Sequence, residues 1–267
     1  MTTGSTKKTS RFFMSECNSK GQALDLSEDL MHYASRVLRL RDNSELRVWN
    51  GRGQEFMGTL HYLSKKLAEI RITEGPLPLP DTELMRPVWI AQALPEGDKM
   101  DWVLEKATEL GAGAFWPIQA QRSVVRLNAE RQEKKAAHWE RVVQAASLQS
   151  ERQHLPQLHS VMSLEAAFES IAKQAPGAQL LWFTPEAGTT LTQWCAGVSG
   201  QLPVTQPLQP LVICVGPEGG WSGEETQWAV EHGAVALQFS RRILRTETFA
   251  LACLSQLTAL LQLESKA

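Results

Sequence analysis

The stretch Val212–Glu225, VICVGPEGGWSGEE, runs from an apolar segment through a glycine-rich loop to a helix start. The continuous apolar run Leu211–Val215 is typical of a parallel strand covered on both faces. Three glycines within Gly216–Gly220 let the backbone turn tightly and approach a ligand closely. Ser222 and Glu225 have the S-x-x-E spacing of a capping box, which fixes the start of the next helix. Ligands of open α/β sheets bind beyond the carboxyl ends of strands, so we predict a ligand loop here; a merely tight strand–helix turn is the alternative.

A second unusual stretch is Ser240–Phe249, SRRILRTETF, which again follows an apolar run and opens a helix. It holds three arginines within five residues. An arginine near the positive end of a helix dipole is unfavourable unless an anion or a polar partner is close. This favours a site at Arg245 or its neighbours, and a solvated charge cluster is the alternative.

Strands alternate with helices on both sides of these loops. The apolar spacing predicts strands at Val88–Leu94, Phe115–Ile118, Leu180–Phe183, Leu211–Val215 and Ala234–Phe239, and helices at Asp98–Leu110, Lys134–Glu151, Glu224–Gly233 and Thr248–Leu263. The alternation indicates an α/β domain with a mainly parallel sheet.

The segment Thr73–Pro87 has four prolines and no apolar periodicity, so we place a domain boundary there, between residues 1–80 and 81–267. Before it, Glu45–Trp49 and Glu55–Leu60 flank Asn50-Gly51. This pattern predicts a hairpin with a type I′ turn. The first domain is therefore expected to be a small β-barrel or compact sheet.

The composition is that of an ordinary globular protein, with 43% hydrophobic and 21% charged residues in 267. No segment approaches the roughly 20 apolar residues of a membrane span. Met1–Ser10 lacks the apolar core of a signal peptide, which predicts a cytoplasmic protein. The four cysteines form no Cys-x-x-Cys pair and the six histidines are scattered, so we expect no structural metal.

Charge is divided unevenly along the chain. The net charge is −2, but residues 1–80 carry 12 Lys and Arg against 9 Asp and Glu, a net of +3, and residues 81–267 carry 15 against 20, a net of −5. A basic first domain is compatible with a phosphate-contacting surface, and equally with an ordinary solvated face.

The chain closely resembles the RsmE-type 16S rRNA (uracil-N3)-methyltransferases of the SPOUT superfamily. The matching motifs cover nearly the whole chain in order: Arg11-Phe12-Phe13, His32 with Val37-Leu38-Arg39, Val48–Gly53, Lys106–Gly111, Gln121-Arg122-Ser123, Gln149–Arg152, Gly216–Gly220 and Arg242–Thr248. The chain departs from the family pattern at Leu148, Phe239-Ser240 and Phe249.

The resemblance implies a fold and a partner. It implies an N-terminal PUA-like β-barrel that helps to hold rRNA and a C-terminal SPOUT-type α/β trefoil-knot domain that binds S-adenosylmethionine. It also implies a homodimer with the active site at the subunit interface, acting on 16S rRNA of the small ribosomal subunit.

The resemblance also implies roles for individual residues. The cofactor would contact three segments: Leu181, Phe183, Thr184 and Pro185; Val215, Gly216, Pro217, Glu218, Gly219 and Gly220; and Phe239, Ser240, Ile243, Leu244, Arg245, Thr246 and Thr248. Arg245 is the first choice to stabilise the uracil anion and Arg122 the second, and either Glu247 or water would accept the N3 proton. The residues expected to contact RNA are Arg11, Arg36, Arg39 and Arg52.

Three alternatives remain open at this point. The chain could methylate a different RNA or a different atom, or it could be an RNA-binding ribosome-assembly factor that has lost catalysis. A dinucleotide-dependent oxidoreductase is disfavoured, because the G-x-G-x-x-G fingerprint is missing, and a P-loop enzyme because no Gly-Lys-Ser/Thr follows the glycines.

Overall fold

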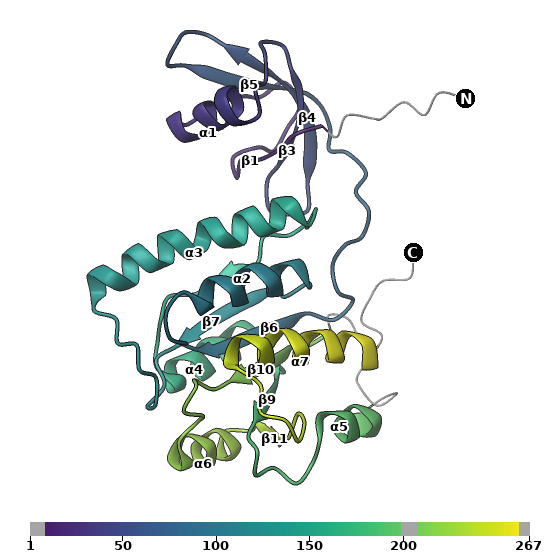
Figure 1. The fold of residues 1–267 in the computed structure, drawn as a ribbon. Coiled ribbons are helices and arrows are strands. Elements are labelled where there is room, and N and C mark those ends of the chain that lie inside the picture. Colours follow the sequence, from purple (N-terminus) through teal and green to yellow (C-terminus); the bar gives the residue numbers. More distant parts are fainter. Residues whose placement is uncertain (1–8, 199–207, 262–267) are drawn as a thin grey trace. The chain divides into compact units, whose positions relative to one another are not determined.

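The computed structural model describes residues 9–198 and 208–261 (Figure 1). The chain divides into two compact units, Met1–Asp81 and Thr82–Ala267, each with its own hydrophobic core. No helix in the described ranges is long and apolar enough to span a membrane.

The first unit is a five-stranded sheet with the strand order β1-β3-β4-β5-β2. Its elements are β1 (Arg11–Phe13), β2 (Ala23–Asp25), α1 (Glu28–His32), the π-helical turn η1 (Tyr33–Val37), β3 (Glu45–Trp49), β4 (Glu55–Tyr62) and β5 (Ala68–Glu74). β1 runs parallel to β3, and the other pairs are antiparallel. Alternating residues of the long strands, such as Leu46 and Val48, are buried in its core.

The predicted hairpin is confirmed as β3–β4, but the predicted type I′ turn is wrong. Trp49 pairs with Glu55, so five residues form the connection instead of two. The buried Asn50 organises this loop, because its Oδ1 accepts hydrogen bonds from the backbone N–H of Arg52 and of Gln54. Since this side chain supplies the closing bonds, the loop does not need positive φ at two consecutive residues.

The second unit contains a six-stranded sheet in which all neighbouring strands are parallel, in the order β11-β9-β10-β6-β7-β8. The strands are β6 (Val88–Ala93), β7 (Ala114–Ile118), β8 (Gln157–Leu158), β9 (Gln179–Phe183), β10 (Leu211–Val215) and β11 (Val235–Leu237). All residues of β6, β7 and β10 are buried, as expected for central parallel strands with nearly continuous apolar sequences.

Helices cover both faces of this sheet (Figure 1). They are α2 (Lys99–Glu109), α3 (Ala129–Gln149), α4 (Leu164–Gln174), α5 (Leu191–Val198), α6 (Gly223–Glu231) and α7 (Thr246–Leu260). Residues of α2, α3, α5 and α7 share one core, and residues of α4 and α6 share the core on the other face. The mainly parallel α/β domain expected from the sequence is confirmed.

Predicted helices α3 and α7 begin two or more residues earlier than expected and α6 begins one residue earlier, whereas α1, η1, α4 and α5 were not predicted. α3 begins at Ala129 because the side chain of Asn128 caps it by accepting from the backbone N–H of Arg131. α7 begins at Thr246, so the Arg-Thr-Glu-Thr motif forms its first turn. The apolar spacing did not lead us to α4 or α5. The three prolines of residues 197–210 predict a surface loop, but residues 197 and 198 belong to α5 and residues 199–207 lie outside the described residues.

Candidate active site

The carboxyl ends of the parallel strands bring the two unusual stretches together. The glycine loop Gly216–Trp221 follows β10, and the arginine-rich loop Gln238–Arg245 follows β11 and leads into α7. α7 packs against β6 and β10 in the middle of the sheet, so the chain returns from the edge strand to the glycine loop. Segments distant in sequence therefore meet at one edge of the sheet (Figure 1).

The glycine loop has the local structure that its sequence predicts. The N–H of Gly220 donates to Pro217 O at 2.8 Å, and Gly220 has a φ of +67°, which an L side chain rarely adopts. The capping box is confirmed: Ser222 Oγ accepts from the N–H of Glu225 at 3.0 Å, and Glu225 Oε2 accepts from the N–H of Ser222 at 2.7 Å. The loop and the helix after it form one well-fixed unit.

Arg122 holds this loop from the side of β7. Its Nη1 donates to Gly219 O and to Trp221 O, both at 3.1 Å. The neighbouring N–H of Gln121 donates to Glu225 Oε1 at 2.8 Å, so the capping glutamate also binds the loop after β7. Arg122 therefore stabilises the conformation of the glycine loop.

Glu218 is held from the side of β6. Its Oε1 accepts from Lys99 Nζ at 2.6 Å and from the N–H of Glu96 at 3.1 Å. Desolvation raises the pKa of Glu218, but these hydrogen bonds and the lysine charge outweigh it, and the pKa falls below its ordinary value. The hydrogen bond to Glu218 raises the pKa of Lys99, and the nearby charge of Glu247 adds to this. Lys99 therefore links the glycine loop to α2, within electrostatic range of Glu247 in the first turn of α7.

A hydrogen bond joins the two loops directly. Thr246, the first residue of α7, donates its hydroxyl to Gly216 O at 2.7 Å. Arg245 is the residue before the helix and is exposed, and its side chain forms no capping bond. Ile243 is 99% exposed, and Leu244 is partly buried. The loop thus holds Thr246 against the glycine loop and exposes the Arg245 guanidinium beside it.

The third predicted segment, at the end of β9, packs against the second. Phe183, Phe239 and Phe249 form a cluster of edge-to-face rings, with centroids 5.0 Å apart for the two pairs that include Phe249. The N–H of Thr184 donates to Leu237 O at 3.0 Å, which holds the two strand ends together. Phe239 and Phe249, two of the residues at which the sequence departs from the expected family pattern, contact each other in this cluster.

The hydroxyl of Ser240, the third departure, is used within the loop. Ser240 Oγ accepts from the N–H of Arg242 at 3.1 Å and donates to Arg242 O at 2.9 Å. These two bonds form a side-chain turn at the start of the arginine-rich loop. The remaining predicted contacts lie along the same segments: Leu181 and Val215 are buried, and Pro185 and Thr248 are exposed.

One predicted RNA contact conflicts with the structure. The side chain of Arg11 is 5% exposed, its Nε lies 2.6 Å from Glu55 Oε2, and its guanidinium packs over the Trp49 ring at 4.6 Å. Arg11 therefore stabilises the first unit, and its side chain is not displayed for RNA. The other predicted contacts, Arg36, Arg39 and Arg52, are exposed on that unit.

The sequence pattern did not lead us to the residues from the β6 side. Gln92 is completely buried near the end of β6, and its Nε2 donates to Thr246 Oγ1 at 2.9 Å. Lys99 opens α2 and bonds the glycine loop. Gln92 could have been identified from the sequence, because a glutamine within an otherwise apolar strand is unusual.

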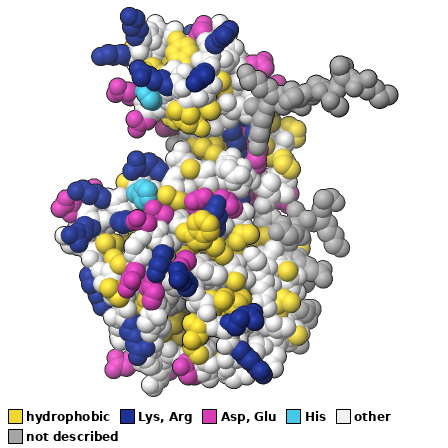
Figure 2. All heavy atoms as spheres, viewed as in Figure 1, with side chains coloured by type: hydrophobic (Ala, Val, Ile, Leu, Met, Phe, Trp, Pro, Cys, Tyr) yellow, Lys and Arg dark blue, Asp and Glu magenta, His cyan; other side chains and the backbone are white. Residues whose placement is uncertain are grey.

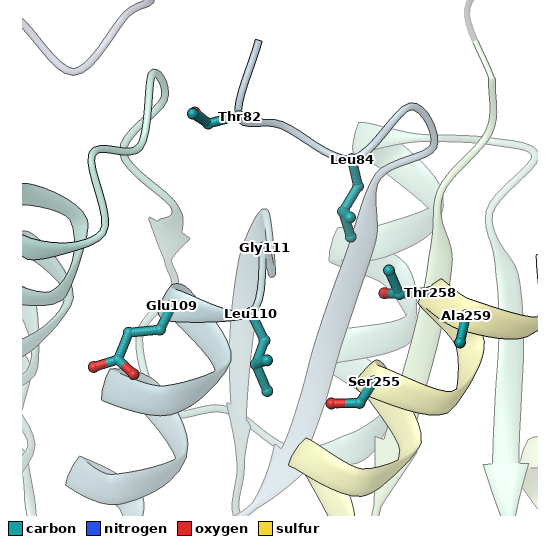
Figure 3. A pocket seen from close by; sticks show the side chains of 8 residues that line it. All are labelled: Thr82, Leu84, Glu109, Leu110, Gly111, Ser255, Thr258 and Ala259. Atoms are coloured by element: carbon teal, nitrogen blue, oxygen red, sulfur yellow. The ribbon is translucent and has the colours of Figure 1, made fainter. Parts of the chain in front are cut away.

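A cavity lies elsewhere in the second unit. It has a volume of about 430 Å³ and is lined by the last turns of α2 and α7, including Leu110, Ser255 and Thr258 (Figure 3). Leu84 and Gly111, which also line it, precede the amino ends of β6 and β7. The cavity therefore lies at the opposite edge of the sheet from the candidate site. The described residues hold no group of three or more His, Cys, Asp or Glu side chains that could bind a metal.

Comparison with known proteins agrees with this arrangement. The family described as "RNA methyltransferase domain" matches residues 82–258, and the family described as "RNA methyltransferase PUA domain" matches residues 26–73. The chain belongs to the RNA methyltransferase family. It is 32% identical to the ribosomal RNA small subunit methyltransferase E of Bacillus subtilis, over 87% of this chain and 89% of that protein. A relative of the same name from Synechocystis is also 32% identical, over 87% of this chain and 71% of that one.

Solved structures of RNA methyltransferases confirm the expected fold. The chain is similar to the ribosomal RNA small subunit methyltransferase E of Neisseria gonorrhoeae bound to S-adenosyl methionine, with a TM-score of 0.78, 30% identity and coverage of 94% of this chain and 98% of that one. It is also similar to a putative methyltransferase of Legionella pneumophila in complex with the cofactor SAM, with a TM-score of 0.79, 28% identity and the same coverage. The second unit has a SPOUT fold and the first a PUA-like fold.

Proposed function

We propose that this protein transfers a methyl group from S-adenosylmethionine to N3 of a uridine in 16S rRNA of the small ribosomal subunit. The observation that carries the proposal is the hydrogen bond from Thr246 to Gly216 O, which joins the two motif loops into one site. Relatives named as small-subunit rRNA methyltransferases, one of them solved with S-adenosyl methionine, support the substrate and the cofactor. The proposal includes a cytoplasmic location, where ribosomal subunits are found.

The chain's own part in the reaction is to bind and orient. S-adenosylmethionine supplies an electrophilic methyl group, so alignment and exclusion of water are the main tasks of the protein. The backbones of Gly216–Gly220 and Ile243–Thr246 would hold the cofactor, with the end of β9 as the third wall. Arg122, Lys99 and the capping box already fix the glycine loop, so little ordering is left for binding.

The N3 proton of uracil has to leave, and a cation beside the ring favours the anion. Arg245 fits this role because its guanidinium is exposed next to the site. Arg122 already donates to two loop carbonyls, which favours a holding role for it. Glu247, with one buried carboxylate oxygen that has no partner among the described residues, or a water molecule would accept the proton.

A methyl-transfer assay tests the proposal against its alternatives. Purified protein, methyl-labelled S-adenosylmethionine and 16S rRNA, free or in small subunits, should give labelled N3-methyluridine. A labelled methyl group on another atom or in another RNA would indicate that this protein is a methyltransferase with a different target. Rigorous absence of cofactor binding would favour a non-catalytic assembly factor.

We expect the enzyme to act as a homodimer, as the family resemblance implies. Figure 2 shows hydrophobic side chains exposed among charged ones on the face where α2 and α7 lie. Trp102 of α2 is 51% exposed, Leu110, which follows α2, is 39% exposed, and Leu260 of α7 is 37% exposed. A second copy would cover such side chains. Light scattering should report twice the 29.7 kDa chain mass. A monomer with full activity at assay concentration would contradict this prediction.

The first unit is expected to supply phosphate contacts through Arg36, Arg39 and Arg52. Replacing all three by glutamine should weaken binding to 16S rRNA and flatten its salt dependence. Each lost phosphate contact lowers the steepness of the plot of log binding constant against log salt concentration by about 0.7–0.9. S-adenosylmethionine affinity should not change.

A matched control keeps the same loss of charge but moves it to exposed basic residues of α3, namely Arg131, Lys134 and Arg141. The control should retain most of the salt slope. Equal slopes for both triple variants would mean that the first unit is only a scaffold.

A further inference from the structure

Gln92 is the polar exception in β6. All residues of this strand are buried, and five of its six residues are apolar. Burying a side-chain amide is unfavourable unless it is hydrogen-bonded, so a glutamine here calls for an explanation beyond packing. Gln92 pairs in the sheet with Val215, the residue just before the glycine loop. Its position places it beside the candidate site.

The hydrogen bonds of Gln92 have a fixed direction. Its Nε2 donates to Thr246 Oγ1 and to Ala93 O, both at 2.9 Å. Thr246 gives its single hydroxyl proton to Gly216 O at 2.7 Å, so its oxygen can only accept from Gln92. Turning the amide over would place Oε1 against the carbonyl of Ala93, which excludes that orientation. The chain of donors therefore runs from Gln92 through Thr246 to Gly216.

We propose that Gln92 is a positioning residue of the cofactor site, acting through Thr246 on the glycine loop. Thr246 begins α7 and Gly216 begins the loop, so this chain sets the spacing of the two segments that would enclose the cofactor. Sites of this kind bind best when such spacing is fixed before the ligand arrives. The inference rests on the proposed function, because it assumes that these loops bind S-adenosylmethionine.

The two hydrogen bonds leave one polar group of the Gln92 side chain unused, the amide oxygen Oε1. Gln92 Oε1 is buried and has no hydrogen-bond partner among the described residues. Its two donors, both used, dictate where it points. An acceptor left open in this way is available to a buried water molecule, so Thr246 remains the route by which Gln92 acts on the two loops.

Calorimetry of S-adenosylmethionine binding to the full-length protein tests the proposal. Gln92→Met removes the N–H donors but keeps a side chain of similar length. Thr246→Val removes the hydroxyl but keeps a side chain of the same shape. Each should weaken binding about two- to tenfold, the value of one ordinary hydrogen bond. The double variant should bind no more weakly than Thr246→Val alone, and Thr246→Ser, which keeps the hydroxyl, should bind like the wild type.

Two controls separate positioning from stability. Thr108→Val removes another buried hydroxyl without a described partner, in α2, and should leave cofactor affinity unchanged. Gln92→Glu keeps the shape of the side chain but loses the donors when ionised. Its affinity relative to the wild type should recover as the pH falls, because a protonated carboxyl can donate to Thr246.

The outcomes are distinct. Unchanged affinity in a folded Gln92→Met variant, additive losses in the double variant, or no pH-dependent recovery in Gln92→Glu would overturn the proposal. A wild-type protein that does not bind S-adenosylmethionine would instead refute the proposed function.

Discussion

Gly219→Val is expected to weaken S-adenosylmethionine binding about ten- to a hundredfold, because forcing extra carbons into a packed contact costs about 1–3 kcal/mol. The nearest atoms to a Cβ at Gly219 belong to Arg122, at 3.4–3.8 Å, so the first added carbon makes ordinary van der Waals contact in the free protein. The backbone of Gly219 is exposed on the loop that would contact the cofactor. The added side chain should therefore clash with the ligand and leave the fold intact.

Calorimetry on the full-length variant measures this loss. Gly197→Val is the matched control, since its Cβ in α5 would meet no described residue within 4 Å and lies outside the predicted site. The control should bind as the wild type does. A folded Gly219→Val protein with wild-type affinity would remove the glycine loop from the cofactor site.

Arg245→Met is expected to lower kcat by about 10²–10³, the loss seen when a group that stabilises a developing anion is removed. Cofactor affinity should change little, because the Arg245 side chain is exposed and does not cap α7. The guanidinium acts by favouring the uracil anion, so the deficit should shrink as the pH rises and more of the anion forms without help.

Single-turnover rates at several pH values check this. Arg241→Met removes an exposed arginine of the same loop that lies outside the family motif, and it should keep most of the activity. An Arg245→Met variant with a normal rate, or with a deficit that does not depend on pH, would assign the role to another residue.

The glycine loop, its capping box and the alternation of strands and helices could be predicted because each depends on neighbours in sequence. Ser222 and Glu225 are three residues apart, and their reciprocal bonds follow from that spacing. The start of α7 was misplaced by two residues, because Arg245 provides no side-chain cap to mark it.

The contacts that hold the loops could not be predicted, because they join residues far apart in the chain. Lys99 reaches Glu218 across 119 positions, and Gln92 reaches Thr246 across 154. Only the order of the strands brings these pairs together. Arg11 shows the opposite error, since its motif suggested a surface role, but Glu55 and Trp49 bury it. The trefoil knot and the shared dimer site come from the family resemblance, and they stay predictions.

Mass-spectrometric mapping of 16S rRNA from cells with and without this gene tests the central claim most directly. We expect one N3-methyluridine to be present with the gene and absent without it. The wild-type gene should restore the mark, and the Arg245→Met form should restore little of it. An unchanged set of N3-methyluridines in cells that lack the gene would contradict the proposed function.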